Sequence, residues 1–451
     1  MKKNQVFTAT IEDFRLPNRG IATVEDKRVV VHNGLPGQRV EAKVFRKRRG
    51  VIEARVTELL EPAPWEQKAQ CPHFGPCGGC TWQTMPYEMQ LELKGKQVQR
   101  LLANAGISEF QWLGISPSPT PWAYRNKMEF TFGDRERGGE LTLGLHCKGR
   151  FYEILTTDNC QIVDSDFTLA LTTVLEYCRR EQIPFFHRSS HQGVLRHLVV
   201  RKGIKTGQLL LNLVTTSQGE LDLEPLVRQL RERNFTGQLV GVLHTINDSK
   251  GDVVQSDETR ILWGQDHFTE EILGLKFRIS PFSFFQTNSL GAEVLYSTVR
   301  EFAGDTTDKV IFDLYCGTGT IAQVMAPQAK QVFGIELVEE AVEAARTNTA
   351  LNGLDNCQFI AGDVTEQLDN LAEQPDVIIL DPPRSGVNPK AIAKVAQYQA
   401  PQILYVSCQP KSLARDLKEF TALGYQVDKV QCVDMFPHTP HVETVCLMSR
   451  N

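Results

Sequence analysis

Apolar and polar residues alternate in short runs over the first 60 positions of the chain. The segments 6–14 (VFTATIEDF) and 39–59 (RVEAKVFRKRRGVIEARVTEL) show this period of two, which is typical of strands with one buried face. Turn signals at 18–20 (NRG) and 34–37 (GLPG) separate the runs. The pattern predicts a small five-stranded β-barrel over residues 1–60.

The next segment mixes helical and strand patterns. After the linker-like segment 62–64 (PAP), helical spacing over about 86–105 ends at Asn104-Ala105-Gly106. Strand-like runs follow at 124–133, 194–203 and 207–216. We therefore expect a mixed α+β central domain over residues 61–280, with the helix at 86–105 a candidate to pack on the domain that follows.

From residue 281 to 451, strands alternate with helices, which predicts a parallel α/β sheet. The segment 309–326 (KVIFDLYCGTGTIAQVMA) indicates a buried strand, a tight turn and a helix. Gly317 and Gly319 allow that turn and the close approach of a ligand. The third glycine of a dinucleotide-binding turn is absent. The segment therefore predicts a different nucleotide-type cofactor.

Acidic residues end the strands after this turn: Glu336, Asp363 and Asp381, the last followed by two prolines. Buried carboxylates are costly without partners, so such a set at one sheet edge indicates a binding site. Glu336 is placed to accept hydrogen bonds from ribose hydroxyls. Together with the glycine turn, these residues resemble the S-adenosylmethionine-dependent methyltransferase fold, a Rossmann-like α/β fold.

Cys408 ends the apolar run 402–407 (QILYVS), and Pro410 prevents simple continuation of that strand. Taken alone, Cys408 would be a buried core thiol. Beside a methyl donor, a thiolate could add to C6 of a pyrimidine and make C5 nucleophilic. A base must then remove the C5 proton. Glu443 is the candidate, with His438 and His441 as alternatives.

Five motifs spread along the chain, at 284–288, 313–321, 380–386, 407–410 and 437–445, resemble the bacterial RNA 5-methyluridine methyltransferases. The resemblance is to the type that acts on 23S rRNA and carries an RNA-binding TRAM barrel, a relative of the OB barrel, and an iron–sulfur cluster. It implies that Cys408 is the nucleophile and Glu443 the base, and that Phe284 lies near the target base. It also implies S-adenosylmethionine contacts from Gln286, Tyr315, Glu336 and Asp381.

Three cysteines lie within ten positions, at Cys71, Cys77 and Cys80, which favours a metal site over chance packing. Cys160 is our choice for the fourth ligand. The resemblance implies a [4Fe–4S] cluster on these four residues, with structural zinc as the alternative. The spacing differs from the CxxxCxxC of radical enzymes, so we expect the cluster to staple a loop-rich domain. Core packing is the expectation for the remaining cysteines, Cys147, Cys178, Cys316, Cys357, Cys432 and Cys446.

Charge divides unevenly along the chain, whose formal net charge is −5. Residues 1–60 carry 13 Lys and Arg against 7 Asp and Glu, whereas residues 301–451 carry 11 against 20. A basic head beside an acidic catalytic part suits a polyanion such as RNA. The candidate RNA contacts are Arg46, Lys47, Arg48, Arg49, Arg125, Lys127, Arg196 and Arg201.

The leading hypothesis is methylation of uracil C5 in a flipped or unpaired uridine of 23S rRNA. The same chemistry on tRNA, methylation of an amino group, a non-catalytic RNA-binding protein and an iron–sulfur electron carrier are the alternatives. The N-terminal segment 1–14 (MKKNQVFTATIEDF) lacks the apolar core of a signal peptide, and no run approaches the roughly 20 apolar residues of a spanning helix. We therefore expect a cytoplasmic, monomeric protein with no membrane or protein partner.

Overall fold

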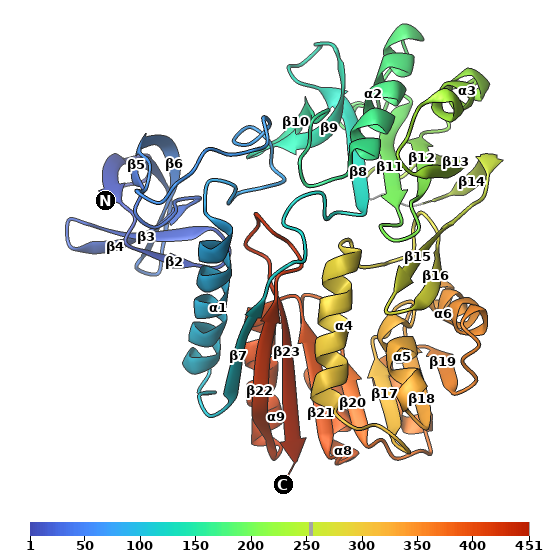
Figure 1. The fold of residues 1–451 in the computed structure, drawn as a ribbon. Coiled ribbons are helices and arrows are strands. Elements are labelled where there is room, and N and C mark those ends of the chain that lie inside the picture. The colour runs from blue at the N-terminus through green and yellow to red at the C-terminus, as the bar shows by residue number, and fades with distance from the viewer. Residues whose placement is uncertain (252–255, 451) are drawn as a thin grey trace.

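The computed structural model describes residues 1–251 and 256–450. Figure 1 shows a small N-terminal β-domain (blue), a central domain (green) and a large sheet with helices on both faces toward the C-terminus (orange and red). None of the helices in the described ranges is long and apolar enough to cross a membrane.

The N-terminal domain is one six-stranded sheet in the order β1-β5-β6-β4-β3-β2. Its two edge strands, β1 and β2, follow each other in the chain, so the sheet curls round on itself. The expectation of five strands was wrong because β2 is only three residues long, too short to show alternation. The strands are β1 (Val6–Thr10), β2 (Asp13–Arg15), β3 (Arg19–Val24), β4 (Lys27–His32), β5 (Arg39–Arg48) and β6 (Val51–Glu61).

The central domain is a seven-stranded sheet in the order β10-β9-β8-β11-β12-β13-β14, with α2 (Ser165–Arg180) and α3 (Glu224–Glu232) packed on it. The three strand-like runs of the sequence lie on β8, β11 and β12, which confirms them as strands. The strands are β8 (Lys127–Asp134), β9 (Leu141–Cys147), β10 (Arg150–Thr156), β11 (Leu195–Lys202), β12 (Gln208–Thr215), β13 (Gln238–Ile246) and β14 (Glu258–Gly264).

The C-terminal domain is built on an eight-stranded sheet in the order β19-β18-β17-β20-β21-β23-β22-β7. The first five strands are parallel, and β23 runs antiparallel to both of its neighbours. The strands are β7 (Gln111–Ser116), β17 (Val310–Leu314), β18 (Gln331–Glu336), β19 (Cys357–Ala361), β20 (Val377–Leu380), β21 (Gln402–Ser407), β22 (Tyr425–Val433) and β23 (Glu443–Arg450).

Helices cover both faces of this sheet, so its central strands are apolar on both sides. In β20, Ile378 and Leu380 pack toward one core, and Val377 and Ile379 toward the other. The first core also takes side chains from α1 (Tyr87–Asn104), α7 (Val364–Gln367), α8 (Pro389–Gln397) and α9 (Pro410–Ala422). The second takes side chains from α4 (Ser289–Ala303), α5 (Thr320–Met325), α6 (Glu339–Leu351) and the hairpin of β15 (Phe268–Ile272) and β16 (Leu275–Ile279).

A boundary at residue 281 does not describe the C-terminal sheet. Its last strand, β7, comes from the segment assigned to the central domain and pairs with β22, and α1 packs against α9 (Figure 1). The buried ion pair of Lys94 and Asp434, with 2.6 Å between Nζ and Oδ1, joins α1 to the loop before β23. The sequence predicted helix α1, but it gave no sign that Lys94 is buried in an ion pair with Asp434.

Candidate active site

The carboxyl ends of the parallel strands bring most of the predicted site residues to one edge of the sheet. Tyr315 follows β17, Asp381 follows β20 and Cys408 follows β21, while Glu336 is the last residue of β18. In an open α/β sheet, ligands bind in the crevice outside these ends, where the strand order reverses. The order β18-β17-β20 contains such a reversal, between the glycine turn and Asp381.

Cys408 and Glu443 come together because β23 is antiparallel to β21. Ser407, the last residue of β21, pairs with Thr444, so the next residue on one strand, Cys408, lies opposite the previous residue on the other, Glu443. An antiparallel strand presents its first residue at the edge where its parallel neighbours present their last. The register therefore sets the thiol and the carboxyl side by side.

Burial, and for Cys408 and Glu443 also the neighbouring carboxyls, raises the pKa values of three acids at this edge of the sheet. Burial, with the nearby charges of Glu443 and Asp381, raises the pKa of Cys408 to about 11. Burial and Asp381 raise the pKa of Glu443 to about 8, and burial raises that of Asp381 to about 7. The guanidinium of Arg384 lowers the pKa of both Cys408 and Glu443. Three acids with shifted pKa values in one crevice are typical of a reaction centre.

Sequence reasoning did not identify three residues near this centre. Arg384 follows Pro383 in the chain, and no local signal indicated its electrostatic effect on Cys408 and Glu443. Tyr296 of α4 is buried beside Asp381, Asp313 and Glu443, near the side chain of Gln286. Asp313 is fully buried and accepts a 2.8 Å hydrogen bond from the amide of Ala322. A carboxylate inside an otherwise apolar strand was the only signal for Asp313.

The glycine turn after β17 has the backbone that the sequence predicted. Gly317 and Gly319 have φ of 54° and 70°, in the left-handed region that favours glycine. A Cβ at Gly319 would lie 2.5 Å from the ring of Phe359, whereas one at Gly317 would meet only the Phe284 ring, at 3.9 Å. The turn is thus closed toward the core at Gly319 and open toward the crevice at Gly317.

Glu336 holds this turn with one carboxylate oxygen and its own following loop with the other. It accepts a 3.0 Å hydrogen bond from the amide of Gly317 and another of 3.0 Å from the amide of Val338. Asp363 lies further along the edge, where it accepts a 2.8 Å hydrogen bond from the amide of Thr365 and caps α7. Asp363 therefore has a structural role in the described fold, in addition to the ligand contact expected of it.

Two aromatic side chains flank the turn. Phe284 is 67% exposed beside Gly317, and its carbonyl accepts a hydrogen bond from Thr318. Tyr315 has a φ of 65°, and burial, with Asp363 and Asp416 nearby, raises its pKa to about 12. The exposed ring of Phe284 gives the crevice an apolar side suited to a flat ligand.

His438 has a structural place that argues against a role as base. Its ring stacks on Trp122 with 3.9 Å between ring centres, and its amide donates a 2.8 Å hydrogen bond to Gln90. Its carbonyl accepts from the amides of Thr81 and Trp82. Burial lowers the pKa of His438 to about 4, as it does that of His441. Of Glu443, His438 and His441, Glu443 is the one that the sheet register places opposite Cys408.

The four cysteines predicted as metal ligands surround one cavity in the central domain. Cys71, Cys77, Cys80 and Cys160 all line it, with Leu145 and Ile162 among its apolar walls. Burial and the neighbouring thiols raise the pKa of Cys80 to about 12 and that of Cys160 to about 11. Within residues 1–251 and 256–450, no group of three or more His, Cys, Asp or Glu side chains is arranged to hold a single metal ion. A cavity lined by four thiols, with His73, Gln83 and Thr157 as its other polar side chains, fits a thiolate-bound group, which would supply the positive charge that thiolates need.

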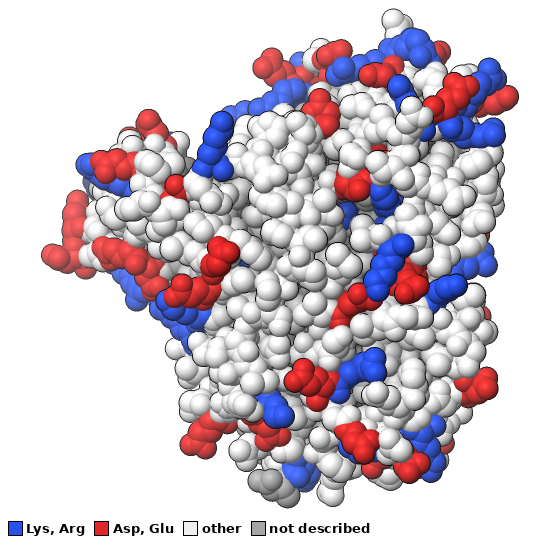
Figure 2. Space-filling view, in the orientation of Figure 1, with Lys and Arg blue, Asp and Glu red and all other residues white. Residues whose placement is uncertain are grey.

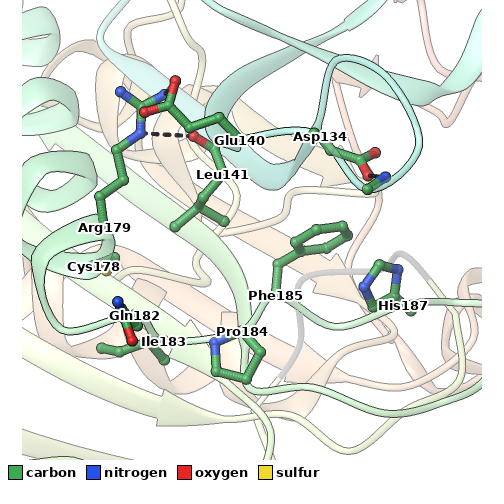
Figure 3. Close-up of a pocket in the computed structure, with 12 residues that line it drawn as sticks. Asp134, Glu140, Leu141, Cys178, Arg179, Gln182, Ile183, Pro184, Phe185 and His187 are labelled. Carbon is green, nitrogen blue, oxygen red and sulfur yellow. Dashed lines mark hydrogen bonds and ion pairs between the residues drawn. The ribbon is translucent and has the colours of Figure 1, made fainter.

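A larger hollow of about 410 Å³ lies elsewhere in the central domain (Figure 3). Its walls come from residues between Asp134 and His187, and Arg179 donates to the carbonyl of Leu141 at its rim. It contains none of the predicted catalytic or cofactor-binding residues, so its size does not mark the reaction centre.

The predicted RNA contacts divide into exposed and buried groups. Residues Arg46–Arg49 are exposed on the hairpin of β5 and β6, where Arg46 pairs with Glu53. Figure 2 shows that acidic side chains also lie on this N-terminal domain. Lys127 pairs with Glu129 at 2.6 Å, and Arg125 donates to the carbonyl of Lys127.

Two of the proposed cations were wrong as surface contacts. Arg196 is buried and donates to the carbonyls of Asn247 and Ser249. Arg201 is buried and donates to the carbonyls of Pro281 and Ser283, and burial lowers its pKa to about 10. The sequence around a strand arginine does not show whether its side chain is buried. Both arginines are covered by segments that lie far away in the chain, near residues 247–249 for Arg196 and 281–283 for Arg201.

Comparison with known proteins agrees with the sheet and its crevice, which have the form of an S-adenosylmethionine-dependent methyltransferase. The family model for tRNA (Uracil-5-)-methyltransferase matches residues 252–451, and that for the TRAM domain matches residues 2–57. An uncharacterized RNA methyltransferase of Caldanaerobacter subterraneus subsp. tengcongensis is 52% identical over 451 residues, covering 100% of both chains. Another, of Clostridium tetani, is 50% identical over 450 residues, covering 100% of this chain and 99% of that one.

A solved structure extends the likeness to the whole architecture. The Pyrococcus abyssi tRNA (uracil-54, C5)-methyltransferase in complex with S-adenosyl-L-homocysteine is 27% identical, with a TM-score of 0.77. The alignment covers 98% of this chain and 100% of that chain. The chain belongs to the TRAM-bearing family of S-adenosylmethionine-dependent RNA uracil-5-methyltransferases.

Proposed function

We propose that the protein methylates C5 of a uracil in 23S rRNA through a covalent bond between Cys408 and C6. The observation that carries this proposal is the register of β21 and β23, which sets Cys408 opposite Glu443 beside Asp381. Gln286, Tyr315, Gly317, Glu336, Asp363 and Asp381 are the residues that would hold the cofactor. When bound, S-adenosylmethionine supplies an electrophilic methyl group on a sulfonium ion.

The reaction needs a nucleophile because C5 of uracil is too weak to take a methyl group directly. The Cys408 thiolate adds to C6, and the electron pair of the C5–C6 double bond moves into the ring as an enolate. C5 then takes the methyl group, while the electron pair of the broken methyl–sulfur bond stays on the sulfur and S-adenosylhomocysteine leaves. Glu443 removes the C5 proton, the C–H electron pair restores the double bond, and the C6–S bond breaks to release the thiolate.

The Cys408 thiol must lose its proton before its sulfur can add to C6 of the uracil. A thiol with a pKa of about 11 is protonated near neutral pH, and two neighbouring carboxyls favour that state. Arg384 opposes them, because its guanidinium stabilises the thiolate and the ionised form of Glu443. We assign to Arg384 the role of lowering both pKa values in the crevice.

The kind of RNA is proposed from the enzymes that the chain resembles. The resemblance to cluster-bearing, TRAM-bearing enzymes supports 23S rRNA, while the family name and the Pyrococcus abyssi relative name tRNA. The exposed cations Arg46–Arg49 are proposed to meet RNA phosphates, and Phe284 to contact the flipped base.

Covalent trapping on 5-fluorouridine RNA tests the proposed chemistry. Fluorine at C5 cannot leave as a proton does, so wild-type protein with S-adenosylmethionine should form a denaturation-resistant, methylated complex. Ribosomal and transfer RNA, each containing 5-fluorouridine, are compared, and the position of the adduct names the target. Cys408→Ala should give no complex. A complex that persists in Cys408→Ala, or no complex on either RNA with cofactor binding intact, would refute the mechanism.

We also propose that Cys71, Cys77, Cys80 and Cys160 hold a [4Fe–4S] cluster that staples the central domain. Support comes from the one cavity that all four thiols line and from the resemblance seen in the sequence. Purification without oxygen should yield protein with four irons and four acid-labile sulfides, because four thiolates hold this cluster. Iron and zinc analysis with the visible absorption spectrum is the measurement. Cys160→Ser should lose the iron, whereas Cys178→Ser, a buried thiol outside the cavity, should keep it. Stoichiometric zinc would overturn the assignment.

A further inference from the structure

The hairpin of β9 and β10 exposes aromatic rings at one edge of the central sheet. Phe151 is 54% exposed and Tyr152 is 76% exposed, and their ring centres are 5.6 Å apart. The ring of His146 stacks on Phe151 with 4.9 Å between centres and 1° between planes. Large apolar side chains grouped on a surface mark an interaction site more often than single ones do. We call Tyr152, Phe151 and His146 the aromatic platform.

Cations surround the aromatic platform. The guanidinium of Arg188 lies 4.3 Å from the ring centre of Phe151. Lys148 and Arg150 are exposed at the hairpin tip, and the segment 145–152 (LHCKGRFY) contains no acidic residue. Glu153, the next residue, forms a 3.0 Å ion pair with Arg150. Exposed rings among cations are what single-stranded nucleic acid requires, since bases stack and phosphates need positive charge.

The segment 71–80, which carries Cys71, Cys77 and Cys80 and is here called the cysteine loop, holds this hairpin in place. The amide of Gly78 donates a 2.9 Å hydrogen bond to the carbonyl of His146, and the amide of Lys148 donates a 2.8 Å bond to the carbonyl of Pro76. Cys77 and Cys147 form an isolated antiparallel bridge between the two segments. A Cβ at Gly78 would lie 2.9 Å from the same His146 carbonyl, so the backbones touch. A platform fixed in this way loses little conformational entropy when it binds a ligand.

We infer that the aromatic platform binds unpaired nucleotides of the RNA substrate by base stacking. Bases stack on Tyr152, whose ring is the most exposed and is supported by Phe151, while Lys148 and Arg150 contact the phosphates. The site is separate from the TRAM hairpin and from the catalytic crevice. The inference rests on the proposed RNA substrate, and it gives the cysteine loop the role of holding a surface that positions RNA.

The test measures binding of the full chain to a labelled oligouridylate of about 12 nucleotides, by fluorescence anisotropy at a fixed salt concentration. All proteins carry Cys408→Ala, so that no covalent complex forms. Phe151→Ala with Tyr152→Ala should weaken binding about tenfold or more, because each stacked base contributes about 1–3 kcal/mol. Tyr152→Trp should keep the affinity. Ile261→Ala is the matched control, since Ile261 is also 54% exposed on β14, at the opposite edge of the same sheet.

Each other outcome overturns the inference. Unchanged affinity in the double variant would show that the rings do not stack on bases. An equal loss of affinity for an RNA duplex of about 12 base pairs would show that the change was not to stacking. A change in sedimentation of the double variant would show that this edge is an interface between protein copies. Methyl transfer to RNA is measured separately on protein that keeps Cys408. A failure of the platform inference changes the binding result only, whereas a failure of the catalytic proposal changes the methyl-transfer result.

Discussion

Glu443→Gln is expected to stop the reaction after methyl transfer and to leave RNA attached to the protein through Cys408. Glutamine is nearly the same size as glutamate but cannot accept the C5 proton, so the double bond cannot re-form and the thiolate cannot leave. The covalent complex should therefore accumulate on ordinary uridine RNA. Turnover should fall by about 10²–10⁴-fold, the usual contribution of a positioned base.

The measurement is a denaturing gel with RNA and S-adenosylmethionine, followed by mass analysis of the attached nucleotide. Wild-type protein should show little adduct, Cys408→Ala none, and Glu443→Gln a methylated adduct that persists. His441→Gln is the neighbouring control and should turn over and release RNA as wild type does. If His441→Gln also traps RNA, or Glu443→Gln releases methylated product, the base is not Glu443.

The same assignment predicts a pH dependence. With a pKa of about 8, Glu443 is mostly protonated below pH 8 and becomes a base as the pH rises through that value. Release of methylated RNA should therefore slow as the pH falls below 8. In Glu443→Gln, the remaining slow release should lose this dependence. Single-turnover release at a series of pH values is the measurement.

Several parts of the fold and the site followed from local sequence signals. The glycines at 317 and 319 identify a tight turn because few other residues adopt its backbone, and the acidic strand ends indicated a common edge. The TRAM barrel and the methyltransferase fold were confirmed by the family comparisons. In each case, the information lies within a few residues of the feature.

The features that the sequence did not predict depend on contacts between segments that are distant in the chain. Strand β7, at Gln111–Ser116, joins the catalytic sheet from far before the boundary that we predicted at residue 281, and no local pattern gives the partner of a strand. Tyr296 enters the site only because α4 packs across β21 and β23. Arg201 has the pattern of a surface cation, but the loop at 281–283 covers it. Burial of this kind is decided by tertiary packing.

The buried pair of Lys94 and Asp434 should be the most sensitive point in the attachment of α1 to the catalytic sheet. Both side chains are fully buried, and Nζ of Lys94 also donates to the carbonyl of Phe436 and lies over the ring of Trp82. Lys94→Met fills similar space but leaves Asp434 as an unpaired buried acid. We expect a loss of about 3–5 kcal/mol in the free energy of unfolding, the usual cost of breaking a buried pair from one side.

Two further variants show whether the loss of stability comes from the buried ion pair or only from the loss of a lysine. Lys94→Met with Asp434→Leu removes both charges and should recover most of the lost melting temperature, because an apolar pair avoids the cost of burying charge. Lys96→Met, in the same helix, breaks an exposed pair with Glu92 and should cost no more than about 0.5 kcal/mol. Thermal unfolding of the four proteins is the measurement. If Lys94→Met and Lys96→Met lower the melting temperature equally, the buried pair does not anchor α1. The loop that Asp434 begins leads directly to Glu443, so a destabilised anchor should also slow methyl transfer before the protein unfolds.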